Sequence, residues 1–298
     1  MVSRAALLIF GGCSYAKEKG ALNSIEAVSV QIDSTGKPIV QSELCGTLKS
    51  PRRSPSVFHH EYRGILICGG CSGEGQHLDS MEVLKVENKN CESKEITAKL
   101  VAENSCAAFS HFKNKRLIFG GFNGFDCLTL VQIIHGGSEK EDLKVQLLKG
   151  SLPRLKNAVC CNIDEEYFLL VGGWEDEKRT SAGVRRVDFD EDFTEVRNEF
   201  LTSLPYPVEG HSVVKKGRKL FVIGGYDGIR VQDKIVVFDL ESRKSEILDT
   251  KLTIPRENHV SGIIGEKYLV VAGGWDSRNS LDSVELLEII EETPCVWG

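Results

Sequence analysis

The feature that most constrains the fold of this 298-residue chain is a pair of adjacent glycines that recurs six times. Successive pairs lie 58, 51, 52, 52 and 49 residues apart, and each closes a short apolar run such as YFLLV or LFVI. A period of about fifty residues is typical of a fold built from one repeated unit. Such a scaffold favours binding over catalysis. The pairs are Gly11-Gly12, Gly69-Gly70, Gly120-Gly121, Gly172-Gly173, Gly224-Gly225 and Gly273-Gly274.

Each repeat contains four short strand patterns, which we label a to d in chain order, with the glycine pair at the end of strand b. In the fifth repeat they are HSVVKK from His211, KLFVI from Lys219, KIVVFDL from Lys234 and KSEILDT from Lys244. Strand b is continuously apolar, whereas c and d alternate, and no helical period persists. The pattern predicts an all-β, six-bladed β-propeller with four-stranded antiparallel blades. We expect a single domain, 1–298, with blades starting near residues 1, 52, 104, 155, 209 and 257.

The first repeat has no room for a strand a, since only MVSR precedes its strand b. We therefore expect an incomplete, three-stranded first blade. The C-terminal PCVWG could complete the sixth repeat as strand d or lie beside the first repeat. Its offset from the preceding strand matches the other repeats, which favours the first arrangement.

The composition indicates the cellular compartment of the protein and excludes some classes of partner. The ten cysteines follow no disulfide spacing and no secretory signal is evident, which predicts reduced thiols in the cytoplasm or nucleus. No apolar run approaches the ~20 residues of a membrane span. The net charge is −6 and no basic run occurs, so neither nucleic acid nor membrane is an expected partner.

The repeats resemble the kelch family. The glycine pairs are followed by an aromatic–acidic–glycine type of turn in GGFNG from Gly120, GGWED from Gly172, GGYDG from Gly224 and GGWDS from Gly273. Pro-Arg turns occur in PRRS from Pro51, PRLKN from Pro153 and PRENH from Pro255, and His211 and His259 open strand a as in the family. The first two repeats depart from the pattern, reading GGCSY and GGCSG, and the family's strand-d tryptophan survives only as Trp297. The resemblance implies a propeller but names no function.

Motifs that could carry chemistry are weak. Cys68 and Cys71 have CxxC spacing but straddle the end of a strand, and no second ligand pair of matching spacing follows. Kelch-like enzymes that bind iron use E-x3-D-x3-H, and none of the seven histidines has Asp four residues before it. The copper-oxidase and sialic-acid mutarotase branches are exported proteins. We expect no enzyme activity, no cofactor and no metal.

The b–c and d–a loops of a four-stranded meander emerge on the same face, and arginines and aromatic residues collect there. Arginine clamps carboxylates and stacks on rings, as residues that dominate binding energy often do. We expect a partner to bind there. Phe122 and Phe125 lie on the same loops. Individual arginines could instead brace neighbouring blades, or be neutralised by Glu175, Asp176, Asp227, Glu257 and Asp276. The predicted partner-binding residues are Arg52, Arg53, Asn123, Arg154, Trp174, Arg179, Tyr206, Tyr226, Arg230, Arg256, Asn258, Trp275 and Arg278.

The predicted function is a protein-interaction module or scaffold that binds an acidic or phosphorylated segment, as kelch substrate adaptors do. Ubiquitin-ligase components and the cytoskeleton, including actin, are the partners that the resemblance implies, for a propeller that is itself monomeric. The alternative is a small-molecule or sugar-active protein that uses the central channel.

Overall fold

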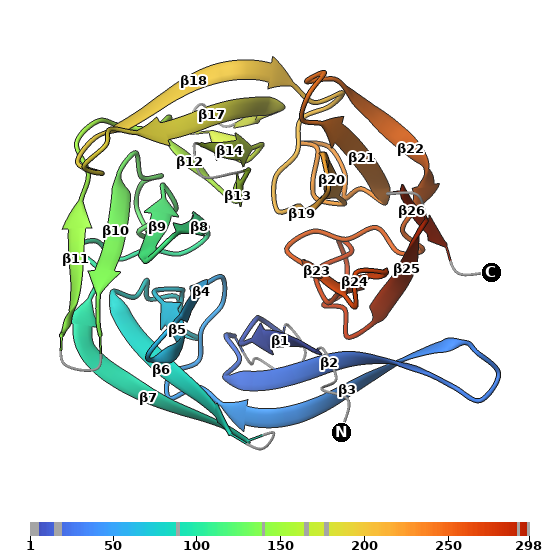
Figure 1. Cartoon of the computed structure of the whole chain (residues 1–298), viewed down its shortest axis with the longest axis horizontal. Coiled ribbons are helices and arrows are strands. Elements are labelled where there is room, and N and C mark those ends of the chain that lie inside the picture. Colours follow the sequence, from blue (N-terminus) through green and yellow to red (C-terminus); the bar gives the residue numbers. More distant parts are fainter. Residues whose placement is uncertain are drawn as a thin grey trace.

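The computed structural model describes residues 6–14, 20–87, 90–138, 141–163, 167–175, 179–290 and 293–296. These residues form strands β1 to β26 and contain no helix, so none of them belongs to a helix that could cross a membrane. Antiparallel meanders stand around a central axis like the blades of a propeller (Figure 1). The predicted all-β propeller is confirmed.

Blades 1 to 3 follow one another in chain order. Blade 1 has β1 (Ala6–Phe10), β2 (Ser24–Ile32) and β3 (Pro38–Thr47). Blade 2 has β4 (Ser56–His60), β5 (Gly64–Cys68), β6 (Ser80–Glu87) and β7 (Asn90–Lys99). Blade 3 has β8 (Ala108–Phe112), β9 (Lys115–Phe119), β10 (Val131–Gly136) and β11 (Leu143–Leu147).

Blades 4 to 6 complete the ring. Blade 4 has β13 (Val159–Asn162), β14 (Phe168–Val171), β17 (Gly183–Phe189) and β18 (Val196–Ser203). Blade 5 has β19 (Ser212–Lys216), β20 (Lys219–Ile223), β21 (Lys234–Asp239) and β22 (Ser245–Lys251). Blade 6 has β23 (Val260–Ile264), β24 (Tyr268–Ala272), β25 (Val284–Ile290) and β26 (Thr293–Val296). A small unpredicted sheet of β12 (Leu155–Lys156), β15 (Trp174–Glu175) and β16 (Arg179–Thr180) sits beside blade 4.

The two chain ends lie as the sequence predicts. β26 pairs antiparallel with β25 and so completes blade 6 as strand d. Blade 1 is three-stranded in the described residues, because β1 pairs with β2 and no strand a is seen beside it. The MVSR segment and Trp297 lie outside the described residues.

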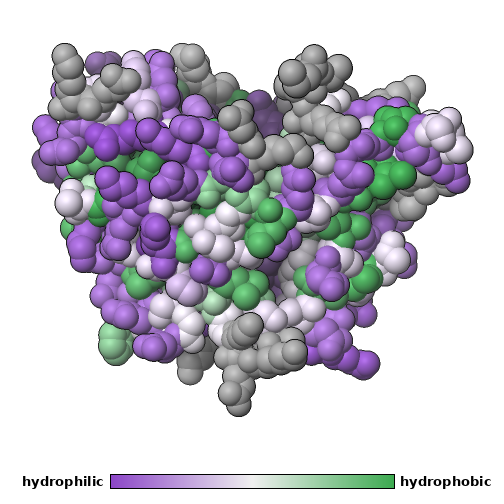
Figure 2. Space-filling model, turned by 90° about the horizontal axis from the view of Figure 1, so that it is seen from below, coloured by the Kyte–Doolittle hydropathy of each residue, from purple (hydrophilic) through white to green (hydrophobic). Residues whose placement is uncertain are grey.

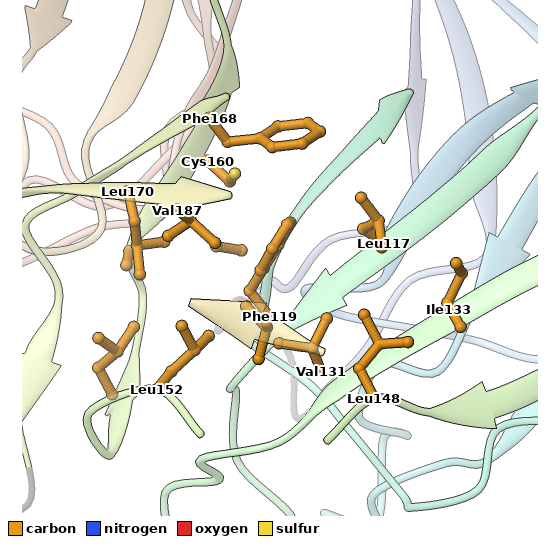
Figure 3. Close-up of a cluster of buried hydrophobic side chains, with 14 of the residues drawn as sticks. Leu117, Phe119, Val131, Ile133, Leu148, Leu152, Cys160, Phe168, Leu170 and Val187 are labelled. Carbon is orange, nitrogen blue, oxygen red and sulfur yellow. The ribbon is translucent and has the colours of Figure 1, made fainter. Parts of the chain in front are cut away.

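The hydrophobic core is divided among the spaces between neighbouring blades. Figure 3 shows one such space, where Phe119 of blade 3 and Phe168 of blade 4 approach with ring centroids 5.9 Å apart. Strand b supplies residues to the spaces on both of its sides, which is why its sequence is continuously apolar. The b strands β9, β14, β20 and β24 are almost entirely buried as a result.

The seam between blades 6 and 1 is the thinnest of these cores. Among the described residues its fully buried members are Val28, Ile264 and Val270, with half-buried neighbours such as Leu7. β1 is the b strand of blade 1, yet none of its residues is fully buried. In every blade that has a strand a, strand b is more deeply buried than β1 is in blade 1. Blade 1 is therefore the blade with the least buried packing.

Both glycines of each pair adopt positive φ, and the first glycine of most pairs also allows another segment of the chain to approach closely. At Gly224 φ is 58° and at Gly225 it is 92°. A Cβ on Gly224 would also lie 2.5 Å from the carbonyl oxygen of Arg256. The first glycine therefore satisfies both requirements at once.

The outer rim is polar. Viewed from the lower edge of Figure 1, where β3 and β7 lie, the surface is mainly hydrophilic, and hydrophobic residues stand in small groups (Figure 2). Leu44 of β3 is an exposed hydrophobic residue, with 68% of its surface open to solvent. The rim does not present one continuous apolar patch on this side (Figure 2).

Candidate binding face

The d–a and b–c loops lie at the same end of the propeller, as the meander topology requires. In each of blades 2 to 6 the residue after the glycine pair forms an antiparallel bridge with a residue of the d–a loop. We call the surface formed by these two sets of loops the loop face. The bridges are Arg53 with Cys71, Ser105 with Phe122, Lys156 with Trp174, Glu209 with Tyr226 and Glu257 with Trp275.

A ring of backbone hydrogen bonds holds the d–a loops together around the axis. The ring residues are Ser54, Cys106, Asn157, Gly210 and Asn258, one from each of blades 2 to 6, with φ between 50° and 58°. In blades 3 to 6 the N–H of the ring residue donates to the carbonyl of the ring residue one blade earlier, for example Asn157 to Cys106 at 2.8 Å and Asn258 to Gly210 at 2.6 Å. The left-handed conformation that this requires is costly for residues other than glycine. The ring fixes the spacing of the loops above it.

Two predicted binding residues, Arg52 and Arg256, are braces inside the fold, and for them the prediction is wrong. Both have none of their surface exposed. Arg52 donates to the carbonyl oxygens of Gly69 at 2.7 Å and Ser80 at 2.9 Å and pairs with Glu82. No part of either side chain is left for a partner.

Arg256 repeats this arrangement in blade 6. It donates to the carbonyl oxygen of Gly273 at 2.8 Å and pairs with Glu285 at 2.6 Å. Its own carbonyl accepts the N–H of Gly225 from blade 5, so the residue ties two blades together. Asn104 bridges blades 2 and 3 in the same way, donating to the carbonyl of Gly120 at 2.7 Å.

Arg154 differs from Arg52 and Arg256 in its place within the loop. It stands one residue before the position whose carbonyl accepts a hydrogen bond from the preceding blade. The N–H of Gly121 donates to the carbonyl of Leu155, the position that Arg52 and Arg256 hold in their loops. Leu155 is 2% exposed and joins the core. Arg154 is thereby displaced outward, 53% exposed, with its Nη1 3.7 Å from an oxygen of Asp126.

The tips of the b–c loops are shaped by the polar residue of the aromatic–acidic turn. The Oδ1 atom of Asn123 accepts from the N–H groups of Phe125 and Asp126, and Asp227 and Asp276 do the same in blades 5 and 6. The Oδ1 atom of Asn123 is therefore used within its own loop, and contact of this residue with a partner stays a prediction. These carboxylates are also caps rather than neutralising partners of the arginines. Predicted Asp176 lies outside the described residues.

The capped tips present exposed side chains to solvent. Arg230 and Arg278 are exposed there, as predicted. Phe125 and Ile229 occupy the central tip position of their loops and are 89% and 87% exposed. Ile229 is not among the residues predicted from the sequence, although its place directly after Asp-Gly could have revealed it.

The aromatic residues after the glycine pairs are half-buried. Trp174, Tyr226 and Trp275 have intermediate exposure, since their backbones pair with the d–a loops. Tyr206 is also half-buried, and burial together with Asp227 and Asp233 raises the pKa of its hydroxyl to about 12. Part of each of these four side chains is therefore accessible to solvent.

Two lysines and a histidine absent from the prediction join these rings. The Nζ atom of Lys234 lies 5.1 Å from the ring centroid of Tyr206, and that of Lys156 lies 4.3 Å from that of Phe122. Ser105 and His77 are within hydrogen-bond distance at 3.0 Å, and the His77 ring packs edge-on to Phe122. Cation–π contacts of this kind have no signature in local sequence.

Cys71 and Arg53 show what replaces the aromatic residue in blade 2. Arg53 Nη2 donates to the Cys71 Sγ at 3.4 Å, and the two backbones exchange hydrogen bonds. Cys68 is fully buried, and that burial raises the pKa of its thiol to about 12. The CxxC pair is therefore built into the packing, as the strand placement suggested.

A hollow of about 370 Å³ opens on the loop face of blade 4. Arg179 and Arg185 line it, together with Thr180, Ser181 and Phe200. The Arg185 guanidinium lies 5.9 Å from the ring centroid of Phe200, which is 56% exposed. Arg179 is 66% exposed and pairs with Glu175 at 3.2 Å. Only Arg179 and Glu175 of these residues were predicted from the sequence to lie on this face, because Arg185 and Phe200 lie within strands.

The chain is similar to known proteins in sequence and in fold. Residues 207–250 match the kelch motif. A Rho GTPase-activating protein of Dictyostelium discoideum, gacHH, is 34% identical over 85 residues, which are 26% of this chain and only 5% of that protein. The solved structure of YjhT aligns with 99% of this chain and 97% of its own, at a TM-score of 0.70 and 12% identity. At that identity the likeness concerns the fold.

Proposed function

We propose that this β-propeller, in which residues 207–250 match the kelch motif, is a protein-interaction module that binds an acidic segment of a partner on the loop face. Kelch-repeat proteins commonly mediate protein interactions, but the fold by itself does not choose a ligand. The proposal that the ligand is acidic rests on the hollow in blade 4. We further propose that the protein acts in the cytoplasm or nucleus, in keeping with its unpaired cysteines.

The proposal rests on the environment of the Arg185 side chain. Its side chain is half-buried in the hollow, and among the described residues no carboxylate pairs with it. A guanidinium that is partly withdrawn from water and stacked near a ring binds a carboxylate or phosphate more strongly than one in bulk solvent. Thr180 and Ser181 supply hydroxyl groups in the same hollow.

The rest of the loop face is suited to support this contact. Arg154, Arg230 and Arg278 are exposed on it, which provides positive charge that steers an acidic segment despite the net charge of −6. Phe125 and Ile229 add apolar tips that a partner can cover. Partners bound in this way combine a few anchoring residues with a wider complementary rim.

The proposal is tested with synthetic peptides that differ at a single central position, which carries Glu, phosphoserine, Gln or Lys. Binding is measured by fluorescence anisotropy at low and physiological salt. We expect the Glu and phosphoserine peptides to bind and the Lys peptide not to bind. Arg185→Glu should weaken binding by at least about tenfold, equivalent to 1.4 kcal/mol.

The matched control is Arg197→Glu, which reverses an exposed arginine on β18 of the same blade, towards the opposite end of the strand. It should leave peptide affinity unchanged. Equal binding of all four peptides, or equal losses in the two variants, would reject the acidic segment. The melting temperature of each variant shows whether the fold is retained.

One observation favours a small-molecule function at the channel as a second candidate. Glu209 and Glu257 occupy equivalent positions in blades 5 and 6, each directly before a ring residue. Burial and the neighbouring Glu209 raise the pKa of Glu257 to about 7, and perturbed carboxyl pairs are common at catalytic sites. A metal assay and a metabolite thermal-shift screen test this candidate. A stoichiometric metal, or a large stabilisation that Glu257→Gln abolishes, would favour it.

A further inference from the structure

Two cysteine side chains meet at the outer rim between blades 1 and 2. Cys45 belongs to β3 and Cys91 to β7, the outermost strands of their blades. β3 and β7 run parallel and pair at Gly46 with Cys91 and at Thr47 with Glu92, which joins the two blades into one sheet. The Sγ atoms lie 3.2 Å apart, and the Cys45 thiol is also 3.3 Å from the carbonyl oxygen of Ile25.

A β-bulge directs Cys45 towards Cys91. Ile25 pairs with Gly46, but the next residue, Glu26, pairs with Leu44, so Cys45 is the extra residue in its strand. A bulge of this kind turns a side chain away from the face that simple alternation would give it. Cys45 consequently packs on the core cluster that contains Cys91.

The glycine beside Cys45 allows the two strands to approach. A Cβ on Gly46 would lie 2.3 Å from the carbonyl oxygen of Cys91 and 2.8 Å from its Cβ. Gly46 does not have positive φ, so its backbone conformation does not require glycine. The missing side chain serves the close approach, and with it the contact between the thiols.

We propose that Cys45 and Cys91 are a modification site at which a small-molecule disulfide such as oxidised glutathione forms a bond between blades 1 and 2. The thiolate of Cys45 attacks one sulfur of the small disulfide and releases the first small thiolate, which takes up a proton. The thiolate of Cys91 then attacks the Cys45 sulfur of the mixed disulfide and releases the second. The two protein thiols are oxidised, and one small disulfide is reduced to two thiols.

The order of attack follows from accessibility. Cys45 is half-buried and remains accessible to a small disulfide, whereas Cys91 is only 8% exposed and is placed to resolve the mixed disulfide. Burial and the neighbouring Cys91 raise the pKa of Cys45 to about 12. Little thiolate is present at neutral pH, so the reaction is slow there and accelerates as the pH rises. The product requires the sulfur atoms to close to about 2.05 Å.

The disulfide between Cys45 and Cys91 would stabilise blade 1, which has the least buried packing of the six blades. Blade 1 has no described strand a, and its seam with blade 6 contains few buried residues. A disulfide between positions separated by 46 residues restricts the unfolded chain and anchors the outer strand of blade 1 to blade 2.

The test equilibrates the intact chain with glutathione redox buffers at pH 8.5, blocks free thiols by alkylation and maps cross-linked peptides by mass spectrometry. We expect a peptide pair joined through Cys45 and Cys91, and a melting temperature at least about 5 °C above that of the reduced protein. The rate of formation should rise between pH 7 and pH 9.

Cys45→Ser and Cys91→Ser should each abolish the cross-link and the rise in melting temperature. Cys13→Ser, which removes a half-buried cysteine elsewhere in blade 1, should retain both. Free thiols at positions 45 and 91 after equilibration, a stable mixed disulfide at Cys45 alone, or a bond from either residue to a third cysteine would overturn the proposal. Mapping of the unaltered chain decides the matter even if a variant fails to fold.

Discussion

Arg52 and Glu82 form an ion pair at 2.9 Å, and neither side chain exposes any surface to solvent. Glu82 also accepts the backbone N–H groups of Lys49 at 2.8 Å and Ser50 at 3.0 Å, so the pair fastens the loop between blades 1 and 2 onto β6. Arg256 and Glu285 repeat the pair in blade 6, where Glu285 accepts from Thr253 and Ile254. The brace therefore recurs at two blade junctions.

Arg52→Ala should destabilise the protein by about 3–5 kcal/mol, because it leaves the buried carboxylate of Glu82 without its cationic partner and takes the guanidinium donor away from two carbonyl groups. Denaturant unfolding measures the change. Arg154→Ala is the matched control, since it removes an exposed arginine from a similar Pro-Arg motif and should change stability by no more than about 0.5 kcal/mol. Similar losses in both variants would show that Arg52 is not a brace.

Gly224→Ala should cost more stability than Gly273→Ala, although both glycines belong to the same repeat motif. The φ angles are similar, 58° and 67°, so the strain of a left-handed alanine, about 1–2 kcal/mol, is common to both. The new Cβ lies 2.5 Å from the Arg256 carbonyl oxygen at Gly224, but 3.6 Å from its nearest neighbour at Gly273. The difference in melting temperature between the variants isolates the steric contribution, and equal melting temperatures would contradict it.

Glu257 should make the protein less stable as the pH rises from about 4.5 to 7. Its pKa is about 7 in the folded protein against an ordinary value of 4.5, so within this window the folded state holds a proton that the unfolded state has lost. The stabilisation is complete below pH 4.5 and is gone above pH 7. Glu257→Gln should therefore raise the melting temperature at pH 8 relative to the unaltered protein, more than it does at pH 4.5.

Comparing the two proteins at each pH removes the contribution of His211 and His259. Burial lowers the pKa of both histidines to about 3, and they titrate alike in both proteins. Glu191→Gln, which alters an exposed carboxyl group, is the control. If the effect of Glu257→Gln on the melting temperature were the same at pH 4.5 and pH 8, the raised pKa would be wrong.

The sequence predicted much of the fold because the determinants are local. The glycine pairs mark where strand b ends, and the apolar runs before them identify the strands whose two faces are buried. The missing strand a of blade 1 and the pairing of β26 with β25 also followed from spacing along the chain. What remained unpredicted, such as the bulge at Cys45 and the small sheet of β12, β15 and β16, depends on pairing between segments.

The residues of the loop face show most clearly which properties follow from the local sequence and which depend on the tertiary structure. The sequence by itself determined that the arginines and aromatic residues of these loops lie at one end of the propeller. Only the tertiary structure decided that Arg52 and Arg256 turn inward, that Leu155 displaces Arg154 to the surface, and that Arg185 lines a hollow. The physical reason is that a side chain's environment depends on which carbonyl or carboxylate the next blade presents. That neighbour lies many residues away, and a one-residue difference in loop length changes which side chain meets it.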